Sequence, residues 1–307
     1  MPLPYQYELD GLTFGGLDAK DCWWIVRRCE GWLGKPKPKA ARTPRPQASG
    51  SFRAASFGGE RSISLVGSTR CPNNDARLEA VERLEAVAGI ETRLYPLVVT
   101  DLRGVSRTAD VELDDEIKVR LVGPYRWFDW TLQLAAPDPH RYDATWQAPR
   151  SGMISTGGPG LNFAGGGLNF APDGLDFGSP GTGLRSQVAN FGTARSYPVF
   201  EITGPVITPR VTDLATGEHI DYGGSLYQGD TLTINCGEFP VTLPGTQGLA
   251  FPARSAFLNV YTDQRVLLSV PSLWPSVGPG EVRNFQLNGS GGLSEAELIV
   301  YLRSAWL

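Results

Sequence analysis

The chain has 307 residues, a net charge of −4, 41% hydrophobic residues and 20% charged residues. This length accommodates two domains of ordinary size, and the composition is that of a globular protein. The small net charge argues against a generic nucleic-acid binder, and no apolar run approaches the length of a membrane span. The N-terminus, Met1 to Tyr5, has neither a basic start nor an apolar core, so no signal peptide is predicted.

The four cysteines, Cys22, Cys29, Cys71 and Cys236, are scattered without a Cys-x-x-Cys pair. We interpret them as free thiols of a protein made in a reducing cytoplasm. A Cys22–Cys29 bridge stays open as the alternative.

Strand patterns open the chain. Tyr5, Tyr7 and Leu9 alternate with polar residues, and residues 23–26 predict a short buried run. A proline-rich basic stretch follows. Between Gly31 and Gly59 there are six basic residues and no acidic one.

The prolines of this stretch predict a stiff, extended loop. It is either a solvated loop or an arm that lies on an acidic neighbour. The candidate inter-subunit contacts of such an arm are Lys35, Lys37, Lys39, Arg42 and Arg45.

One helix is predicted, over about 75–88, after a strand at 62–66. Residues 73–75 cap its start and Gly89 ends it. Its expected apolar stripe consists of Leu78, Val81, Leu84 and Val87 or Ala88. Glu79 and Arg83 are four residues apart on the other side and are expected to pair.

Four strand patterns follow, at 94–99, 109–113, 117–121 and 128–134. The second and third are predicted to form a hairpin around Asp114, Asp115 and Glu116. The fourth has the cleanest half-buried alternation in the chain. Together with the helix, these strands predict an antiparallel β domain over residues 1–150.

A seven-residue repeat organises the middle of the chain. It reads Gly-Leu-Asn-Phe at 160–163 and 167–170, and Gly-Leu-Asp-Phe at 174–177. Glycines and prolines exclude a long helix. We therefore interpret residues 151–192 as a connector between two domains, made of short extended segments. Its candidate packing residues are Leu161, Phe163, Leu168, Phe170, Leu175 and Phe177. A calcium β-roll needs a period of nine, and a phosphate-binding loop needs Gly-Lys-Ser/Thr; neither pattern is present.

Residues 193–307 contain strand patterns at short intervals with turn residues between them. They are 199–202, 206–211, 231–234, 257–261, 285–287 and 297–302. No helical stripe interrupts them, which predicts a C-terminal β-sandwich or jelly roll. The predicted fold class is therefore mainly β with one helix.

We find no combination of residues in the sequence that is typical of a catalytic or metal-binding site. The two histidines, His140 and His219, are far apart and are interpreted as ordinary surface or structural residues. Asp114 and Asp115 are expected to be solvated in a turn. We therefore expect no catalytic, metal-binding or cofactor-binding residues. Trp274 lies in a proline-bounded loop, where it either stacks on a sugar or protein partner or folds over the sandwich edge. Trp306 is expected to close the last strand.

The order of these parts resembles the distal tail protein of long non-contractile-tailed bacteriophages, in particular those of actinobacterial hosts. Four segments carry the resemblance across nearly the whole chain. They are 132–142, the Gly-Leu-Asn-Phe repeats, 197–205 with 229–234, and the Pro-Gly turn at 279–285, where Glu281 stands in place of the expected Asn.

The resemblance implies a structural virion protein, made in the host cytoplasm and located at the tail tip. Family members form a hexameric ring between the tail tube and the tail-tip hub, with a galectin-like second domain pointing outward. The implied partners are copies of the chain itself, the tube and hub proteins, and further the tape measure protein and host cell-wall glycan. No sequence-specific nucleic-acid binding is expected. Deleting residues 35–45 is predicted to weaken the ring while both domains stay folded.

Two other function classes stay open. The sandwich could be a carbohydrate-binding or host-receptor-binding module that uses the loop of Trp274. The chain could instead be a tail-associated glycan hydrolase, although no acid/base pair can be named for that reaction.

Overall fold

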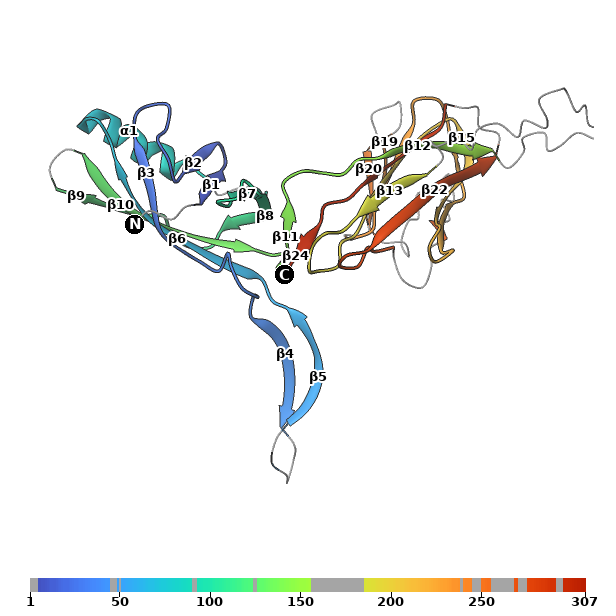
Figure 1. The fold of residues 1–307 in the computed structure, drawn as a ribbon, viewed down its shortest axis with the longest axis horizontal. Helices are drawn as coiled ribbons and strands as arrows, with labels where there is room; N and C mark the ends of the chain where they lie inside the picture. Colours follow the sequence, from blue (N-terminus) through green and yellow to red (C-terminus); the bar gives the residue numbers. More distant parts are fainter. Residues whose placement is uncertain are drawn as a thin grey trace, which may run out of the picture. The chain divides into compact units, whose positions relative to one another are not determined.

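The computed structural model divides the chain into two compact units. Unit 1 comprises Met1–Thr145 and the last two residues, Trp306–Leu307, and unit 2 comprises Trp146–Ala305. Figure 1 shows both units with their strands and the one helix of the described chain. The structure describes residues 5–44, 49, 51–89, 93–123, 126–155, 185–237, 240–244, 250–254, 268–269, 275–290 and 295–307.

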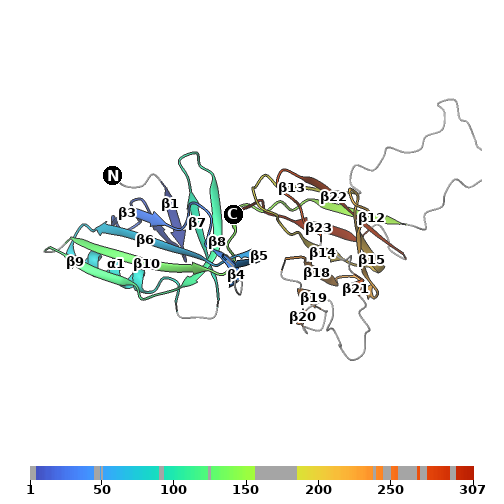
Figure 2. The same cartoon turned by 90° about the horizontal axis from the view of Figure 1, so that it is seen from below.

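Unit 1 is built on one twisted antiparallel sheet with the strand order β2-β1-β7-β8-β10-β6-β3 (Figures 1 and 2). Strand β9 pairs with β10, and β11 pairs with β8 and with the C-terminal strand β24. The strands are β1 (Gln6–Leu9), β2 (Leu12–Phe14), β3 (Trp23–Glu30), β4 (Pro38–Pro44), β5 (Ser51–Gly58), β6 (Arg61–Arg70), β7 (Tyr95–Thr100), β8 (Ser106–Leu113), β9 (Lys118–Val122), β10 (Trp127–Ala136), β11 (Arg141–Asp143) and β24 (Ala305–Trp306).

The core of unit 1 lies on one face of β3, β6 and β10. Along β10, Phe128, Trp130, Leu132 and Leu134 are all buried while the residues between them are partly exposed. This confirms the alternation predicted for that strand. Gly67 of β6 lies opposite Trp130, and a Cβ atom there would meet the indole ring at 2.3 Å. The missing side chain therefore makes room for the largest ring of the core.

Helix α1 (Asn74–Glu85) covers that core. Asn73 caps it, because its side-chain oxygen accepts a hydrogen bond from the backbone N–H of Ala76 at 2.8 Å. The predicted helix is confirmed, and so is most of its stripe: Leu84, Val87 and Ala88 are buried and Val81 is partly buried against the core. Leu78 is the exception, because it is 47% exposed and Ala80 is buried instead.

The predicted Glu79–Arg83 pair is replaced by two pairs with the loop before β3. Glu79 binds Lys20 and Arg83 binds Asp18, at 2.5 and 2.8 Å. Each ion pair joins one residue of α1 to one residue of the loop before β3, some sixty residues away in sequence. The two pairs together fasten α1 to the sheet.

Asp18 is the polar centre of this fastening. Its carboxylate accepts hydrogen bonds from the N–H groups of Lys20 and Cys22, the indole of Trp24 and the guanidinium of Arg83, at 2.8 to 2.9 Å. Burial alone would raise the pKa of Asp18, but these hydrogen bonds outweigh it and hold the pKa below its usual value.

The stabilisation by ionised Asp18 is therefore present above the unfolded pKa of about 3.9 and is lost as pH falls through the lower folded pKa. We expect Asp18→Asn to cost about 2 kcal/mol at pH 7 and to flatten the acid limb of the stability curve. Urea unfolding between pH 3 and pH 7 measures both effects. Asp110→Asn, at an exposed site of β8, is the matched control. A variant curve parallel to that of the wild type would contradict this role.

The predicted hairpin of residues 109–113 and 117–121 is wrong. Strand β9 pairs with β10 along Trp127–Thr131, and β8 pairs with β10 further along, at Leu134 and Ala135. Strands β8 and β9 thus pair with successive parts of the same edge of β10. This is possible because β10 is long enough to accommodate both.

The cysteines of unit 1 are free thiols, and the structure rules out the Cys22–Cys29 alternative. Cys29 lies in β3 and Cys22 just before it, so an extended chain separates them by about 23 Å. Cys22 instead faces Cys71, one step beyond the Trp23–Arg70 pair of β3 and β6, and both thiols are buried. Burial raises the pKa of Cys22 and Cys71, which keeps these thiols protonated.

Unit 2 is a β-sandwich with the strand order β20-β19-β18-β14-β23-β12-β22-β15-β16-β21. Strand β12 pairs antiparallel with β23 in one layer and parallel with β22 in the other, so it joins the two layers. The strands are β12 (Arg150–Ser155), β13 (Ser186–Ala189), β14 (Val199–Thr203), β15 (Val206–Asp213), β16 (His219–Tyr222), β17 (Ser225–Leu226), β18 (Thr231–Asn235), β19 (Pro240–Pro244), β20 (Ala250–Arg254), β21 (Leu268–Ser269), β22 (Val282–Ser290) and β23 (Glu297–Tyr301).

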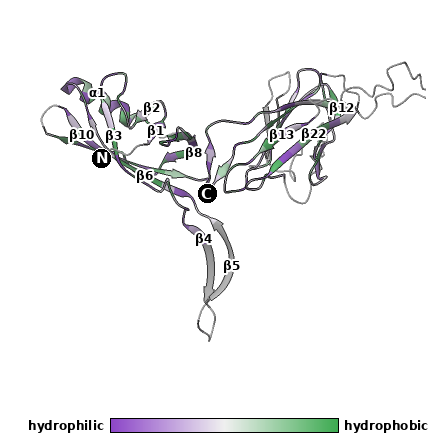
Figure 3. Cartoon of the chain, viewed as in Figure 1, coloured by the Kyte–Doolittle hydropathy of each residue, from purple (hydrophilic) through white to green (hydrophobic). Residues whose placement is uncertain are grey.

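The two layers enclose an apolar core in which Phe200 and Phe285 meet edge to face, with ring centroids 5.0 Å apart. Figure 3 shows how hydrophilic and hydrophobic residues mix along strands such as β22. The mainly β fold with a single helix is therefore as the sequence predicted, for the residues that the structure describes.

The position of the repeat differs from the interpretation as an inter-domain connector. Strand β12 precedes the repeat and β13 follows it, and both pair with β22 of unit 2. The repeat is therefore an insertion within unit 2, because both of its ends are fixed to one strand. The repeat itself, including its six predicted packing residues, lies outside the described residues.

Candidate functional site, a basic hairpin arm

The basic stretch between Gly31 and Gly59 forms a two-stranded antiparallel arm. Strand β4 pairs with β5 from Pro38–Gly58 to Pro44–Ser51, and the pair makes a sheet of its own. Figure 1 shows the arm projecting from the ends of β3 and β6. The predicted extended loop is thus one strand of a hairpin.

Three of the five predicted contact residues are placed by the structure. Lys35, Lys37 and Lys39 are all exposed near the base of the arm. Arg42 lies in β4, in register with Arg53 of β5, but its side chain is outside the described part, as is the whole of Arg45. The arm therefore presents several cations, and the sequence offers no acidic residue within it.

The base of the arm is closed by a tight backbone contact. The N–H of Gly59 donates to the carbonyl of Lys37 at 3.1 Å. A Cβ atom at Gly59 would lie 2.4 Å from that carbonyl oxygen, and one at Gly58 would lie 3.0 Å from the Pro139 ring. These two glycines allow the arm to leave the sheet at this point.

Arg61 anchors the base from inside unit 1. It is 1% exposed, and its guanidinium donates to the backbone carbonyls of Pro139, Gly31, Trp32 and Gly34 at 2.7 to 3.2 Å. Burial lowers the pKa of Arg61, although arginine remains charged at any physiological pH. One buried cation thus ties the segment entering the arm to the end of β10.

No pattern in the sequence predicts this anchor. A single arginine at the start of a strand is expected to be exposed, because arginine is seldom fully buried in folded proteins. Its carbonyl partners lie 27 to 78 residues away, so the contact exists only once the sheet has formed. Chemically, the arm and its base can bind an acidic or extended partner.

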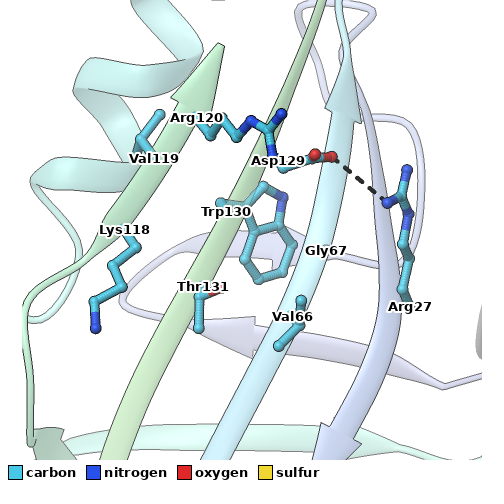
Figure 4. Close-up of a pocket in the computed structure, with 9 residues that line it drawn as sticks. All are labelled: Arg27, Val66, Gly67, Lys118, Val119, Arg120, Asp129, Trp130 and Thr131. Carbon is cyan, nitrogen blue, oxygen red and sulfur yellow. Dashed lines mark ion pairs between the residues drawn. The ribbon is translucent and has the colours of Figure 1, made fainter. Parts of the chain in front are cut away.

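A pocket of about 250 Å³ lies on the sheet face opposite the core, and Figure 4 shows its lining. Its one carboxylate, Asp129, is 3.6 Å from the guanidinium of Arg27 and accepts a hydrogen bond from Ser68 at 2.5 Å. A glycosidase needs two carboxylates facing each other across a cleft. The lining of this pocket therefore does not supply the acid/base pair of a hydrolase.

The histidines make local contacts. His140 Nδ1 lies 2.6 Å from Asp138, which also accepts a hydrogen bond from the hydroxyl of Tyr142. His219 lies 3.5 Å from Asp221. Asp138 also accepts from the backbone N–H of His140, so this cluster is a turn that ends β10. Within the described residues, no group of three or more potential ligands could hold a metal ion.

Trp274 lies outside the described part of the chain. Trp306 lies in β24, where the guanidinium of Arg107 stacks over its ring at 4.3 Å. Of the helices in the described residues, none is long and apolar enough to cross a membrane.

Comparison with known proteins finds similarity in structure alone. No protein-family model and no curated protein matches the sequence. The Dit (gp 19.1) protein of phage SPP1, described as a paradigm of the hub adsorption apparatus in phages infecting Gram-positive bacteria, matches with a TM-score of 0.58 and 10% identity over 99% of both chains. A chain of the phage P2 baseplate in its activated conformation with Ca matches with a TM-score of 0.51 and 11% identity over 97% of both chains. At this identity, the similarity shows a shared fold.

Proposed function

We propose that this chain is a structural component of a bacteriophage tail tip, a distal tail protein that forms a ring, hexameric in our proposal. The observation that carries it is the projecting basic arm on a β unit that is followed by a β-sandwich. The fold shared with a phage hub protein over nearly the whole chain supports the same role. In this role the protein acts by assembly and not by catalysis.

The arm supplies the contact that a ring requires. A closed ring of identical chains needs one surface that reaches a different surface of the next copy. A two-stranded arm can do so by laying its backbone edge and its cations on a neighbour. The proposed partners are copies of the chain, the tail tube protein and the tail-tip hub protein, and further the tape measure protein. We place the protein in the virion, after synthesis in the host cytoplasm, with unit 2 as a galectin-like domain.

The arm can be removed without cutting into the main sheet of unit 1, because β4 and β5 form a sheet of their own. Because Lys37 and Gly59 already form a hydrogen-bonded pair, an Asn-Gly turn can replace residues 38–58. We expect this variant to stay folded and to lose the ring, since the arm is the proposed inter-subunit contact. The measurement is the mass of the purified protein in solution, together with negative-stain images of the same sample.

Two further variants separate charge from backbone contact. Replacing Lys35, Lys37 and Lys39 with glutamine removes the cations near the base, and replacing them with arginine is the matched control that keeps them. Rings of wild-type mass and six-fold shape in the armless variant would refute the proposal for the arm.

A further inference from the structure

A row of exposed apolar residues crosses the sheet of unit 1 on the face opposite its core. Leu17 bridges to Trp23, Trp23 lies opposite Arg70, Arg70 lies opposite Trp127, and Trp127 lies opposite Val122. Directly opposed residues of neighbouring strands place their side chains on one face, within contact of each other. Four strand segments and a loop therefore present one continuous row.

This row faces solvent because the alternate residues fill the core. Trp24, Thr69 and Phe128, one position further along each strand, are buried. By contrast, Leu17 is 67% and Trp23 is 47% exposed.

The row has the composition of a binding surface. Trp127 and Val122 are 37% and 38% exposed, and the Arg70 guanidinium lies 5.9 Å from the centroid of the Trp127 ring. A hollow of about 180 Å³ opens beside it, lined in part by Leu17, Trp23 and Arg70. Tryptophan and arginine dominate the binding energy of protein interfaces, and adjoining exposed apolar side chains mark such surfaces.

The surroundings of the row are mainly basic. Arg70 and Arg126 line the hollow together with one acid, Asp21, and Arg27, Lys118 and Arg120 line the neighbouring pocket on the same face. Asp129 is already engaged by Arg27 and Ser68. This face, which we call the tryptophan face, therefore suits a partner that combines acidic residues with an apolar one.

The same unit carries such a surface on its other side. The outer positions of α1 are Asp75, Leu78, Glu79, Glu82 and Glu85, and all are exposed. Asp75, Leu78, Glu82 and Glu85 recur every three or four residues, which places them on one face of the helix beside Glu79. Leu78, 47% exposed, stands among the four acids, of which Glu79 is paired with Lys20. We call this surface the acidic helix face.

The two faces lie on opposite sides of unit 1. The buried residues Ala80 and Leu84 of α1 share a core with Trp24 and Trp130. The helix therefore covers the core face of the sheet, and the tryptophan face is the other one. Two complementary surfaces on opposite sides of one subunit are what head-to-tail assembly of identical chains requires.

We propose that the tryptophan face of one copy docks against the acidic helix face of the next copy. This inference rests on the proposed ring and names a second contact within it besides the arm. Opposite charges select the register of the two faces, and burial of Trp23, Trp127 and Leu78 supplies the attraction. A basic face with aromatic residues is also the chemistry that binds single-stranded nucleic acid, but that partner leaves the acidic helix face without a role.

A charge swap tests the contact in the full-length protein. One variant carries Arg70→Glu and Arg120→Glu, the other carries Glu82→Lys and Glu85→Lys, and all four sites are exposed. Each variant alone brings like charges together and is expected to weaken self-association about tenfold or more, while the quadruple variant recovers it. Sedimentation velocity over a concentration series measures the association, and urea unfolding verifies that each variant is folded.

Two controls accompany the swap. Asp110→Lys with Glu112→Lys changes the charge by the same amount at exposed positions of β8 and is expected to have no effect. Trp23→Ser removes apolar surface without changing charge and is expected to weaken association as well.

The outcomes separate this inference from the proposed function. Rings that form equally well in both half-swapped variants, or a quadruple variant that does not recover, overturn the contact and leave the ring standing. A wild-type protein that forms no ring overturns both. Single-stranded DNA binding that Arg70→Glu abolishes, without any change in self-association, assigns the face to nucleic acid and also overturns the contact.

Discussion

Replacing Arg61 with methionine is expected to destabilise unit 1 by about 3 kcal/mol. The guanidinium satisfies four backbone carbonyls, those of Pro139, Gly31, Trp32 and Gly34. Hydrogen bonds to a charged group contribute about 1.5 to 3 kcal/mol each when measured singly. Methionine fills a similar volume and removes a buried charge, which offsets part of that loss. The carbonyl of Trp32, a buried residue, nevertheless loses its donor, and the three partly buried carbonyls lose a charged one, so the net effect is destabilising.

The effect extends to assembly. Arg61 ties the segment that enters the arm to the end of β10, and its loss frees that segment. We therefore expect the variant to lose the proposed ring assembly even at temperatures where unit 1 is folded. Urea unfolding followed by tryptophan fluorescence measures the stability, because six of the eight tryptophans belong to unit 1.

A matched control lies one strand away. Arg28 of β3 has a side chain that is 63% exposed and contacts Glu30 at 3.4 Å, so Arg28→Met is expected to change stability by less than about 1 kcal/mol. Arg61→Lys keeps the charge but cannot reach all four carbonyls, and its stability should fall between wild type and methionine. Equal unfolding midpoints for Arg61→Met and Arg28→Met would contradict the anchor.

Local patterns predicted the parts of the fold that depend on local chemistry. The alternation along β10 works because every second residue is large and apolar over the whole strand. The start of α1 follows from Asn73, whose side chain caps the helix within one turn. Both signals lie within a few residues, where periodicity and capping act.

Pairing choices are not local, and there the predictions failed. Residues 109–113 and 117–121 look like a hairpin because they are adjacent, yet both take the edge of β10. The arm looked like a loop because of its prolines. Pro38 and Pro44 stand at the first and last positions of β4, where a strand tolerates proline.

The surfaces were the least predictable part. Residues 23–26 read as one buried run, but Trp23 is 47% exposed and Trp24 is fully buried. Burial alternates along these four residues, but all four are apolar, so the sequence does not show which of them face the core. Arg70 joins two exposed tryptophans from separate strands, and this juxtaposition depends on the register of three strands.

The second large effect is expected at Asn190 of unit 2, which is fully buried. Its amide Nδ2 donates to the carbonyls of Ala194 and Val277, and its Oδ1 accepts from the N–H groups of Gly192 and Ala305, at 2.7 to 3.2 Å. One side chain thus satisfies two backbone groups of its own segment and two from segments 87 and 115 residues away.

Asn190→Ala removes all four hydrogen bonds, since the alanine methyl group neither donates nor accepts. The carbonyl of Val277 still accepts from the N–H of Ser196 at 3.0 Å, so the other three groups are the ones that lose their partner. A buried unsatisfied group costs about 1 to 3 kcal/mol, and partial relaxation makes the sum smaller than three such terms. We expect a loss of about 4 kcal/mol in unit 2. Asn288→Ala is the matched control, because its half-buried amide contacts side chains, those of Thr212 and Gln286, and should cost about 1 kcal/mol.

Two probes distinguish the units in this experiment. Far-UV circular dichroism follows both units, whereas tryptophan fluorescence follows mainly unit 1, which holds six of the eight tryptophans. We expect Asn190→Ala to shift the dichroism transition while the fluorescence transition keeps its midpoint. Ala305 is the last residue of unit 2, and its N–H donates to Asn190. Asn190 therefore holds the C-terminal end of unit 2 in place. A fluorescence midpoint that moves together with the dichroism would mean that the two units unfold as one, and the stability of unit 1 would then depend on this single amide.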